Sequence, residues 1–217
     1  MFFRKDKNNL SRKSGFTLIE LMVVLVVFVA LTGIMISSQS KFDGTILLNN
    51  LAYDIALSIR EAQTYGVNVK EFSAGSASKF SGYGIRFDPG VDNKHYILFS
   101  DVNDNNYFDI PNSNPVCPKG DPECVKKYTL TRGSFIQSVC VGLNESTCDT
   151  QYDVNLDKSV SIIFRRPNPD AIIAVGTGGE ISCGGHKCQI AKIIISSANN
   201  ATTSIVVTAL GDIYVKK

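Results

Sequence analysis

The chain has 217 residues, 44% of them hydrophobic and 19% charged, and a formal net charge of +2. The first 15 residues hold five of its 22 Lys and Arg residues and one of its 20 Asp and Glu residues, so the remainder carries 17 basic against 19 acidic side chains. This slightly acidic remainder argues against a strongly basic nucleic-acid surface.

An apolar run begins directly after a basic leader, Met1 to Gly15. From Leu21 to Ile36 the chain has 16 residues without a charge, and the five residues before them bring it to the roughly 20 that a helix needs to cross a bilayer core. A secretory signal has its apolar core before the cleavage site, whereas here the small residue comes first. The basic leader places the N-terminus of the helix in the cytoplasm. We therefore expect residues 16–37 to cross a membrane once, with the C-terminal head outside the cytoplasm.

Glu20 is the one carboxylate in this apolar segment. An ionisable side chain inside a membrane costs about 2.5–3.5 kcal/mol on insertion scales, so by default it marks a functional site. The alternative is a carboxylate near the interface that extends its charged end into water.

The helical period continues beyond the membrane segment, over residues 38–66. Its apolar face recurs at steps of three and four residues and consists of Leu48, Leu51, Ala52, Ile55, Ile59 and Ala62. Gly66 can take the left-handed conformation that ends helices. We expect one helix from Phe16 to about Tyr65, roughly 75 Å long, whose amphipathic second half packs on a globular head.

The head, residues 67–217, shows short β-type runs bounded by Gly, Asn, Asp or Pro. The candidate strands are Tyr83–Phe87, Tyr96–Phe99, Tyr128–Thr131, Ser134–Val141, Val160–Arg165, Ala171–Val175, Ile190–Ser196, Ser204–Leu210 and Ile213–Val215. The fold class is therefore α+β, with an antiparallel sheet covering the second half of the helix. Residues 197–200 are typical of a hairpin turn.

Six cysteines follow the membrane segment, an even number that favours disulfides in an extracytoplasmic head. Six cysteines allow 15 pairings. The preferred pairs are those closest in sequence: Cys117–Cys124, Cys140–Cys148 and Cys183–Cys188. The alternative is a zinc site formed by Cys183, His186 and Cys188, although the Cys-x2-Cys spacing of structural zinc sites is absent.

An oxygen-rich loop begins at Asp101 and resembles a calcium loop. Its candidate ligands stand at relative positions one, three, five, seven and nine: Asp101, Asn103, Asn105, the carbonyl of Tyr107, and Asp109. Asn106 stands where an EF-hand has glycine, and Asn112 where it has a bidentate glutamate. The alternative is an Asx-rich turn between strands. The sequence thus requires no cofactor, and calcium is a candidate.

The leader resembles the class III leader of type IV prepilins and type II secretion pseudopilins. The matching residues are Gly15, Phe16, Thr17, Leu18, Glu20 and Leu21. The resemblance implies that a prepilin peptidase cuts between Gly15 and Phe16 and methylates the new amine of Phe16. It also implies that Glu20 neutralises that amine on a neighbouring subunit during assembly. The resemblance places the chain in the bacterial inner membrane before assembly into a pilus or pseudopilus. The expected partners are the peptidase, other pilin or pseudopilin subunits and an inner-membrane assembly platform.

The head resembles the GspH/FimT family of minor pseudopilins and minor pilins. The resemblance rests on Leu57–Gln63, Tyr83–Phe87, the Asp101 turn, Ser161–Phe164 and a C-terminal strand pair with Gly211 at its turn. DNA-binding members carry arginines after this glycine, whereas this chain ends in Lys216 and Lys217. The resemblance favours a minor subunit of a type II secretion or type IV pilus filament. The alternative is a minor pilin that binds DNA or a surface.

No motif predicts an enzyme. The only histidines are His95 and His186, and no nucleophile elbow, phosphate-binding loop or zinc-protease motif is present in the sequence.

Overall fold

The computed structural model describes residues 15–68, 81–109, 117, 123–148, 159–176, 182–183 and 186–216. The predicted leader before Gly15 lies outside these residues. The chain divides into two compact units, one ending at Phe42 and one beginning at Asp43. Helix α1 (Leu18–Val67) contributes to both units.

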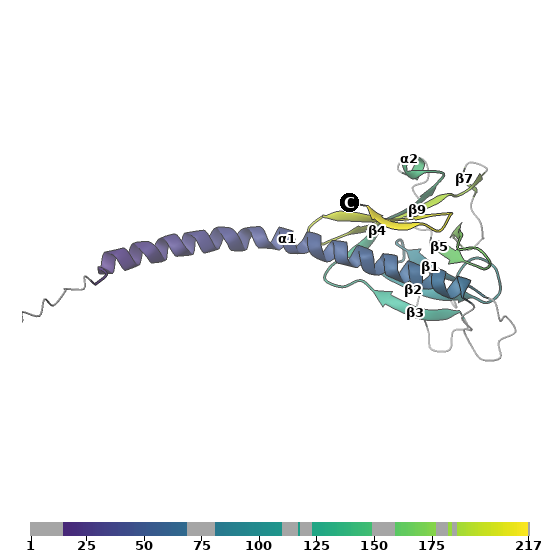
Figure 1. Ribbon diagram of the computed structural model, residues 1–217, viewed down its shortest axis with the longest axis horizontal. Helices are drawn as coiled ribbons and strands as arrows, with labels where there is room; N and C mark the ends of the chain where they lie inside the picture. The colour runs from purple at the N-terminus through teal and green to yellow at the C-terminus, as the bar shows by residue number, and fades with distance from the viewer. Residues whose placement is uncertain are drawn as a thin grey trace, which may run out of the picture. The chain divides into compact units, whose positions relative to one another are not determined.

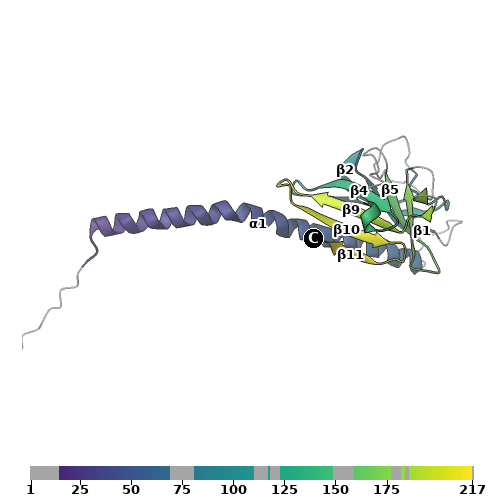
Figure 2. The same cartoon turned by 90° about the horizontal axis from the view of Figure 1, so that it is seen from above.

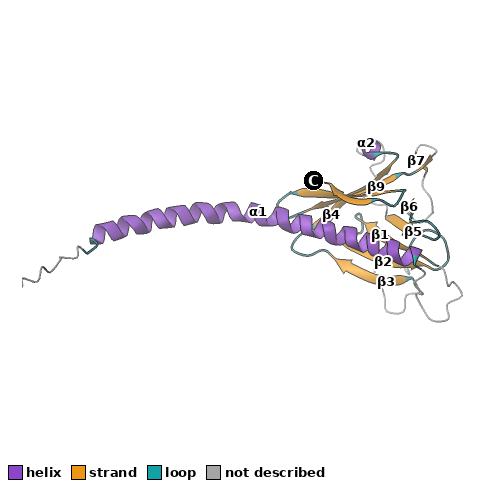
Figure 3. Ribbon diagram, viewed as in Figure 1, coloured by secondary structure: helices purple, strands orange, loops and turns teal. Residues whose placement is uncertain are grey.

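The first unit contains the apolar half of α1. Thr17 precedes the helix and caps it: its hydroxyl accepts the N–H of Glu20 at 3.3 Å, and its carbonyl accepts the N–H of Leu21. The hydroxyl of Thr32 donates to the carbonyl of Phe28 at 2.6 Å, so this polar group is satisfied within the helix. The structure therefore confirms the predicted N-terminal apolar helix, drawn in purple in Figure 3.

In the second unit, the predicted apolar face of α1 lies in the core. Leu48, Ala52, Ile55, Ile59 and Ala62 are at most 1% exposed, and Leu51 packs against them partly buried. Figure 1 shows this half of the helix running across the head, with β4 and β9 above it and β2 and β3 below.

Eleven strands are described, in two main antiparallel sheets and one short hairpin. The five-stranded sheet has the order β3 (Cys124–Thr129), β2 (Asp92–Asp101), β1 (Gly82–Asp88), β5 (Val160–Phe164) and β6 (Ala171–Val175). The four-stranded sheet has the order β11 (Ile213–Lys216), β10 (Thr202–Thr208), β9 (Ile190–Ser196) and β4 (Phe135–Gly142). The short hairpin pairs β7 (Ser182–Cys183) with β8 (His186–Lys187). Figure 2 shows β9, β10 and β11 side by side.

One hydrophobic core joins the second half of α1 to the inner faces of both sheets. Phe87, Leu98 and Phe164 enter it from the five-stranded sheet, and Ile193 and Ile205 from the four-stranded one; all five are fully buried. Burial of such side chains stabilises a fold by about 1.5–3 kcal/mol each. This arrangement confirms the predicted α+β class and the packing of α1 on antiparallel strands.

Polar contacts fix α1 against the five-stranded sheet. The carboxylate of Glu61 accepts hydrogen bonds from the hydroxyls of Tyr65 and Tyr128, each at 2.6 Å. Ser58 and Tyr96 share a hydrogen bond of 3.0 Å, and the Tyr96 and Tyr128 rings stack 4.8 Å apart. Burial and the Glu61 carboxylate together raise the pKa of Tyr128 to about 12, so its hydroxyl stays a donor at neutral pH.

Gly66 has a different role from the predicted one. The helix continues to Val67, and Gly66 is helical rather than left-handed. A Cβ at this position would lie 2.2 Å from the carbonyl oxygen of Phe164 in β5. Glycine is therefore required because the helix backbone approaches the sheet backbone closely.

Gly211 does stand at the predicted turn, between β10 and β11, with a φ of 88°. The Gln63 side chain of α1 donates to the carbonyls of Gly211 and Pro169, at 3.0 and 3.1 Å. Near the end of the helix, a single amide thus links α1 to both sheets. The other predicted turn also forms, because the N–H of Asn200 donates to the carbonyl of Ser197.

Some elements differ from the prediction. Strand β3 begins at Cys124 and ends at Thr129, whereas Tyr128–Thr131 was expected. The pairing of β7 with β8 and the short helix α2 (Glu145–Cys148) were not predicted. Both lie next to disulfides, which hold segments too short to show a period of their own.

Candidate functional site

The predicted processing point lies in an exposed segment immediately before α1. Phe16 is 83% exposed, and the space around Gly15 is open, since a Cβ there would meet nothing within 4 Å. Thr17 begins the helix one residue later through the cap described above. The Gly15–Phe16 peptide bond is therefore accessible to a protease, and the helix follows it directly.

Glu20 lies in the first turn of α1, where a negative charge is favourable beside the free N–H groups of the helix. Thr17 and Glu20 have the spacing of a capping box, in which a threonine is followed three residues later by glutamate. The backbone half of that motif is present, as the N–H of Glu20 bonds to Thr17. Removal of the leader would place the new amine of Phe16 and this carboxylate at the same end of one helix.

The surface of this half-helix is apolar all round. Its large side chains from Leu18 to Ile36 are 51–77% exposed in the single chain. The 19 residues of this span are long and apolar enough to cross a membrane by length and composition. Such a surface is stable only when it is covered by lipid or by similar helices.

The Asp101–Asp109 loop is a series of Asx turns. Both carboxylate oxygens of Asp101 accept backbone N–H groups, from Asn105 and Asn106, each at 3.0 Å. The side-chain oxygens of Asn103 and Asn105 each accept the N–H two residues further on, at 3.2 and 3.1 Å. Their amide nitrogens donate to Asp109, at 2.5 and 3.0 Å. The structure thus brings together four of the five predicted calcium ligands.

Two further residues, missed by the sequence analysis, complete this loop. Arg165 follows β5 and places its guanidinium 2.7 Å from Asp101 and 3.3 Å from Asp104. Glu123 precedes β3 and accepts the N–H groups of Val102, at 3.3 Å, and Asp109, at 2.8 Å. Neither stands in the loop's own motif, and only the pairing of distant strands brings them there.

Burial governs the charges of this cluster. Glu123 is 3% exposed, and burial, together with the negative charges of Asp109 and Asp101, raises its pKa to about 7 despite two backbone hydrogen bonds. Burial also raises the pKa of Asp101, although Arg165 and the backbone N–H groups oppose the shift. A group with a pKa near 7 changes its charge within the physiological range.

The present arrangement does not fit a calcium ion well. Calcium takes six to eight oxygen ligands, but the oxygens of Asp101, Asn103, Asn105 and Glu123 face N–H groups, and Arg165 supplies the positive charge. Within the described residues, no cluster of three or more His, Cys, Asp or Glu side chains has the geometry of a metal site. The loop covers the outer face of the five-stranded sheet, where Phe108 is fully buried against Phe99.

The predicted cysteine pairs lie together in the structure. The Cα atoms of Cys117 and Cys124, and of Cys140 and Cys148, are 5.5 Å apart, and those of Cys183 and Cys188 are 5.1 Å apart. These separations are normal for disulfides, and all three bridges are formed. The bridge at Cys183 and Cys188 uses both thiols of the alternative zinc site.

The Cys140–Cys148 bridge fixes α2 over the outer face of the four-stranded sheet, together with Ile190 and Val206. Glu145 of α2 accepts the hydroxyl of Tyr214 at 2.6 Å and pairs with Lys216, both on β11. One of the two predicted tail lysines is therefore engaged inside the head. Lys217 lies outside the described residues.

Comparison with known protein families gives a match at the start of the chain. A family described as the prokaryotic N-terminal methylation motif matches residues 10–36, which span the end of the leader, Gly15, Phe16, Glu20 and the exposed apolar half-helix. The match supports a type IV pilin-like protein. Such a leader implies processing by a prepilin peptidase and assembly with other pilin subunits. Neither the curated proteins nor the solved structures give a match.

Proposed function

We propose that this chain is a minor pilin or pseudopilin of the GspH/FimT type, a subunit of a type IV pilus or type II secretion filament. A prepilin peptidase cuts after Gly15 and methylates Phe16, and α1 anchors the protein in the inner membrane until assembly. The head then stands on the filament surface or tip. Its role is structural rather than catalytic.

The observation that carries this proposal is the junction at the start of α1. An exposed Gly15–Phe16 bond, a cap at Thr17 and a carboxylate at Glu20 precede a half-helix whose large apolar side chains are all exposed. In a soluble subunit such an apolar surface would stay in contact with water, which is unfavourable, whereas a bundle of similar helices would cover it.

Within that bundle, Glu20 has a definite partner. The amine of Phe16 on a neighbouring subunit carries the opposite charge, and each of these charges alone is expensive away from water. Pairing them therefore selects one axial register between two helices, because only that register leaves neither charge unpaired.

The test is Glu20→Ala in the full-length chain, produced with its own assembly machinery. We expect normal cleavage, read from the mass of the N-terminal peptide, and normal membrane fractionation, but at least tenfold less chain in sheared filaments. That factor corresponds to about 1.4 kcal/mol, a modest value for breaking an ion pair.

Glu20→Asp keeps the charge and is the matched control, and Gly15→Val provides the uncleaved reference. Wild-type levels of Glu20→Ala in the filament would show that the carboxylate does not direct assembly.

Binding of DNA by the head is not favoured by the charges that the structure describes. Lys216 pairs with Glu145, Lys127 pairs with Asp92 at 3.3 Å, and Lys126 lies over the ring of Tyr128. These contacts within the head engage lysines that a phosphate backbone would need.

A further inference from the structure

Arg165, Gly82 and Asp101 form a row across three neighbouring strands at one end of the five-stranded sheet. Gly82 of β1 pairs with Asp101 of β2, and the next residue, Tyr83, pairs with Phe164 of β5. Arg165, which follows β5, therefore stands on the other side of Gly82. A Cβ at position 82 would lie 3.2 Å from Nε of Arg165, so the guanidinium passes over this glycine to reach Asp101.

The guanidinium ends among oxygen atoms of the Asp101–Asp109 loop. Its Nη2 atom lies 2.7 Å from a carboxylate oxygen of Asp101 and 3.3 Å from one of Asp104. The same nitrogen lies 3.2 Å from the side-chain oxygen of Asn106. Asp101 is fully buried, and a buried carboxylate needs a compensating charge. Arg165 supplies that charge from outside the loop.

Arg165 and the N–H donors of the chain together perform the two tasks of a metal ion in such a loop. A bound calcium ion neutralises carboxylates and draws the oxygens of the chain toward one point. Here Asp101 and Asp104 are paired with Arg165. The carboxylates of Asp109 and Glu123 accept N–H groups of the loop. The loop is therefore closed by groups of the chain itself.

We propose that Arg165 takes the place of calcium here: it is an internal cation that lets the Asp101–Asp109 loop close without metal. Calcium then binds the wild type only weakly, because the guanidinium already neutralises the carboxylates that the ion would use. Removal of the guanidinium leaves the buried Asp101 without its positive partner, which is strongly destabilising. A divalent cation can restore the balance, so the loss of Arg165 should make the loop dependent on calcium. The inference concerns the head alone and holds whether or not the chain enters filaments.

Hydrogen exchange in the wild type tests whether the loop closes without metal. The N–H groups of Asn105 and Asn106 donate to the Asp101 carboxylate at 3.0 Å each, so their exchange reports loop closure. The full-length chain in detergent micelles is measured at neutral pH with EDTA and again with millimolar calcium. In EDTA, both amides should exchange at least about tenfold more slowly than in an unfolded chain, and calcium should change their rates by less than about twofold.

Arg165→Met tests whether the guanidinium is the cation, because methionine keeps an apolar stem of similar length and removes the charge. In EDTA, the amides of Asn105 and Asn106 should exchange at least about tenfold faster than in the wild type, and millimolar calcium should restore their protection. Calorimetry should show calcium binding at least about tenfold tighter than in the wild type, since the carboxylates have lost a competing cation.

Arg132→Met is the matched control for the lost charge. Arg132 is exposed in the turn between β3 and β4, and the substitution makes the same chemical change outside the loop. This variant should keep the wild-type exchange of Asn105 and Asn106 in EDTA and the wild-type affinity for calcium.

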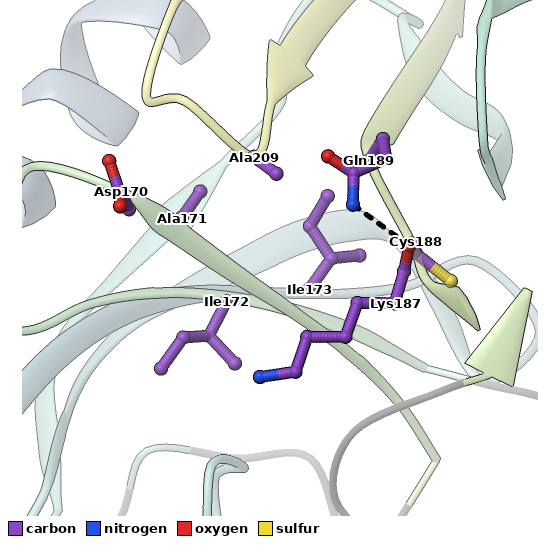
Figure 4. A pocket seen from close by; sticks show the side chains of 8 residues that line it. All are labelled: Asp170, Ala171, Ile172, Ile173, Lys187, Cys188, Gln189 and Ala209. Carbon is purple, nitrogen blue, oxygen red and sulfur yellow. Dashed lines mark hydrogen bonds between the residues drawn. The ribbon is translucent and has the colours of Figure 1, made fainter.

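A second control addresses binding of calcium elsewhere in the head. A cavity of about 280 Å³ is bounded by residues 170–173, residues 187–189 and Ala209. Figure 4 shows Asp170 as the one carboxylate among these described lining residues, together with the ammonium of Lys187. One carboxylate is far from the six to eight oxygens that calcium takes. Adding Asp170→Asn to Arg165→Met should therefore leave the calcium affinity unchanged.

Three results would overturn the proposal. The first is a wild-type loop whose Asn105 and Asn106 amides exchange freely in EDTA and become protected only with calcium. The second is a folded Arg165→Met protein that keeps the wild-type exchange in EDTA or gains no affinity for calcium. If Arg165→Met is unfolded in EDTA, calcium should restore its fold, and an unfolded protein under both conditions is the third.

Discussion

Replacing Gly66 with alanine separates two opposing effects. Alanine has the higher helix propensity, by at most about 1 kcal/mol, which predicts stabilisation. The structure predicts the reverse, because the new Cβ would lie 2.2 Å from the carbonyl oxygen of Phe164, whereas ordinary contacts begin at 3.4 Å. Relief requires α1 and β5 to separate by about 1 Å, and overpacking of this kind costs about 1–3 kcal/mol. Since the Cβ is rigidly attached to the helix backbone and the oxygen belongs to the strand backbone, neither atom can move alone, and we expect the upper end of that range.

The expected net loss is about 2 kcal/mol, or a fall in Tm of roughly 4–8 °C for a head of this size. Thermal unfolding of the full-length chain in detergent, followed by circular dichroism, measures it. Gly44→Ala in the same helix is the matched control, because its nearest neighbour is the Asn199 side chain at 3.1 Å, which can move. Gly44→Ala should leave Tm unchanged or raise it. An equal rise in Gly66→Ala would refute the close approach of the two backbones.

Three further predictions concern the loops. Between pH 4.5 and 7 folded Glu123 keeps a proton that its unfolded form has lost, so the free energy of unfolding should fall by about 1–3 kcal/mol as pH rises through that window. Denaturant titrations of the wild type and of Glu123→Gln at several pH values measure this change. The same dependence of unfolding free energy on pH in both proteins would contradict the shifted pKa. Binding of calcium by the Asp101 loop stays a prediction. Calorimetry should show weak binding of calcium by the wild type and none by Asp101→Asn. The absence of a heat signal from the wild type at millimolar calcium would contradict the prediction. Replacing Cys140 and Cys148 together by serine should lower the free energy of unfolding by about 2–3 kcal/mol. It should also expose the outer face of the four-stranded sheet, which faster amide exchange at Ile190 would report. An unchanged Tm would contradict this prediction.

The sequence predicted those elements whose signal is local. The apolar face of α1 repeats at helical steps, and eight of the nine candidate strands have their positions within a few residues, since β-branched runs end at Gly, Asn or Asp. The predicted processing junction also rests on a local signal, because Gly15, Phe16 and Glu20 adjoin or lie within the apolar run; cleavage there stays a prediction.

What the sequence did not predict depends on contacts between distant segments. Gly66 looked like a helix terminator, and only the approach of Phe164, 98 residues away, shows why glycine stands there. Arg165 and Glu123 meet the Asp101 loop because β5 and β3 flank β1 and β2 in the sheet. No period or motif carries that information.

Under the proposed function the head is exported through the membrane, and the spacing of its three disulfides then has a consequence for their formation. Each joins cysteines only seven, eight or five positions apart. In a chain translocated from its membrane helix onward, each pair is complete once a few further residues have emerged, so oxidation can keep pace with translocation. The next cysteine, Cys140, comes 16 positions after Cys124, and Cys183 comes 35 positions after Cys148, which gives each earlier pair time to close before a competing thiol arrives. We therefore expect the order of emergence to favour the pairing seen in the structure, without later reshuffling of the bridges.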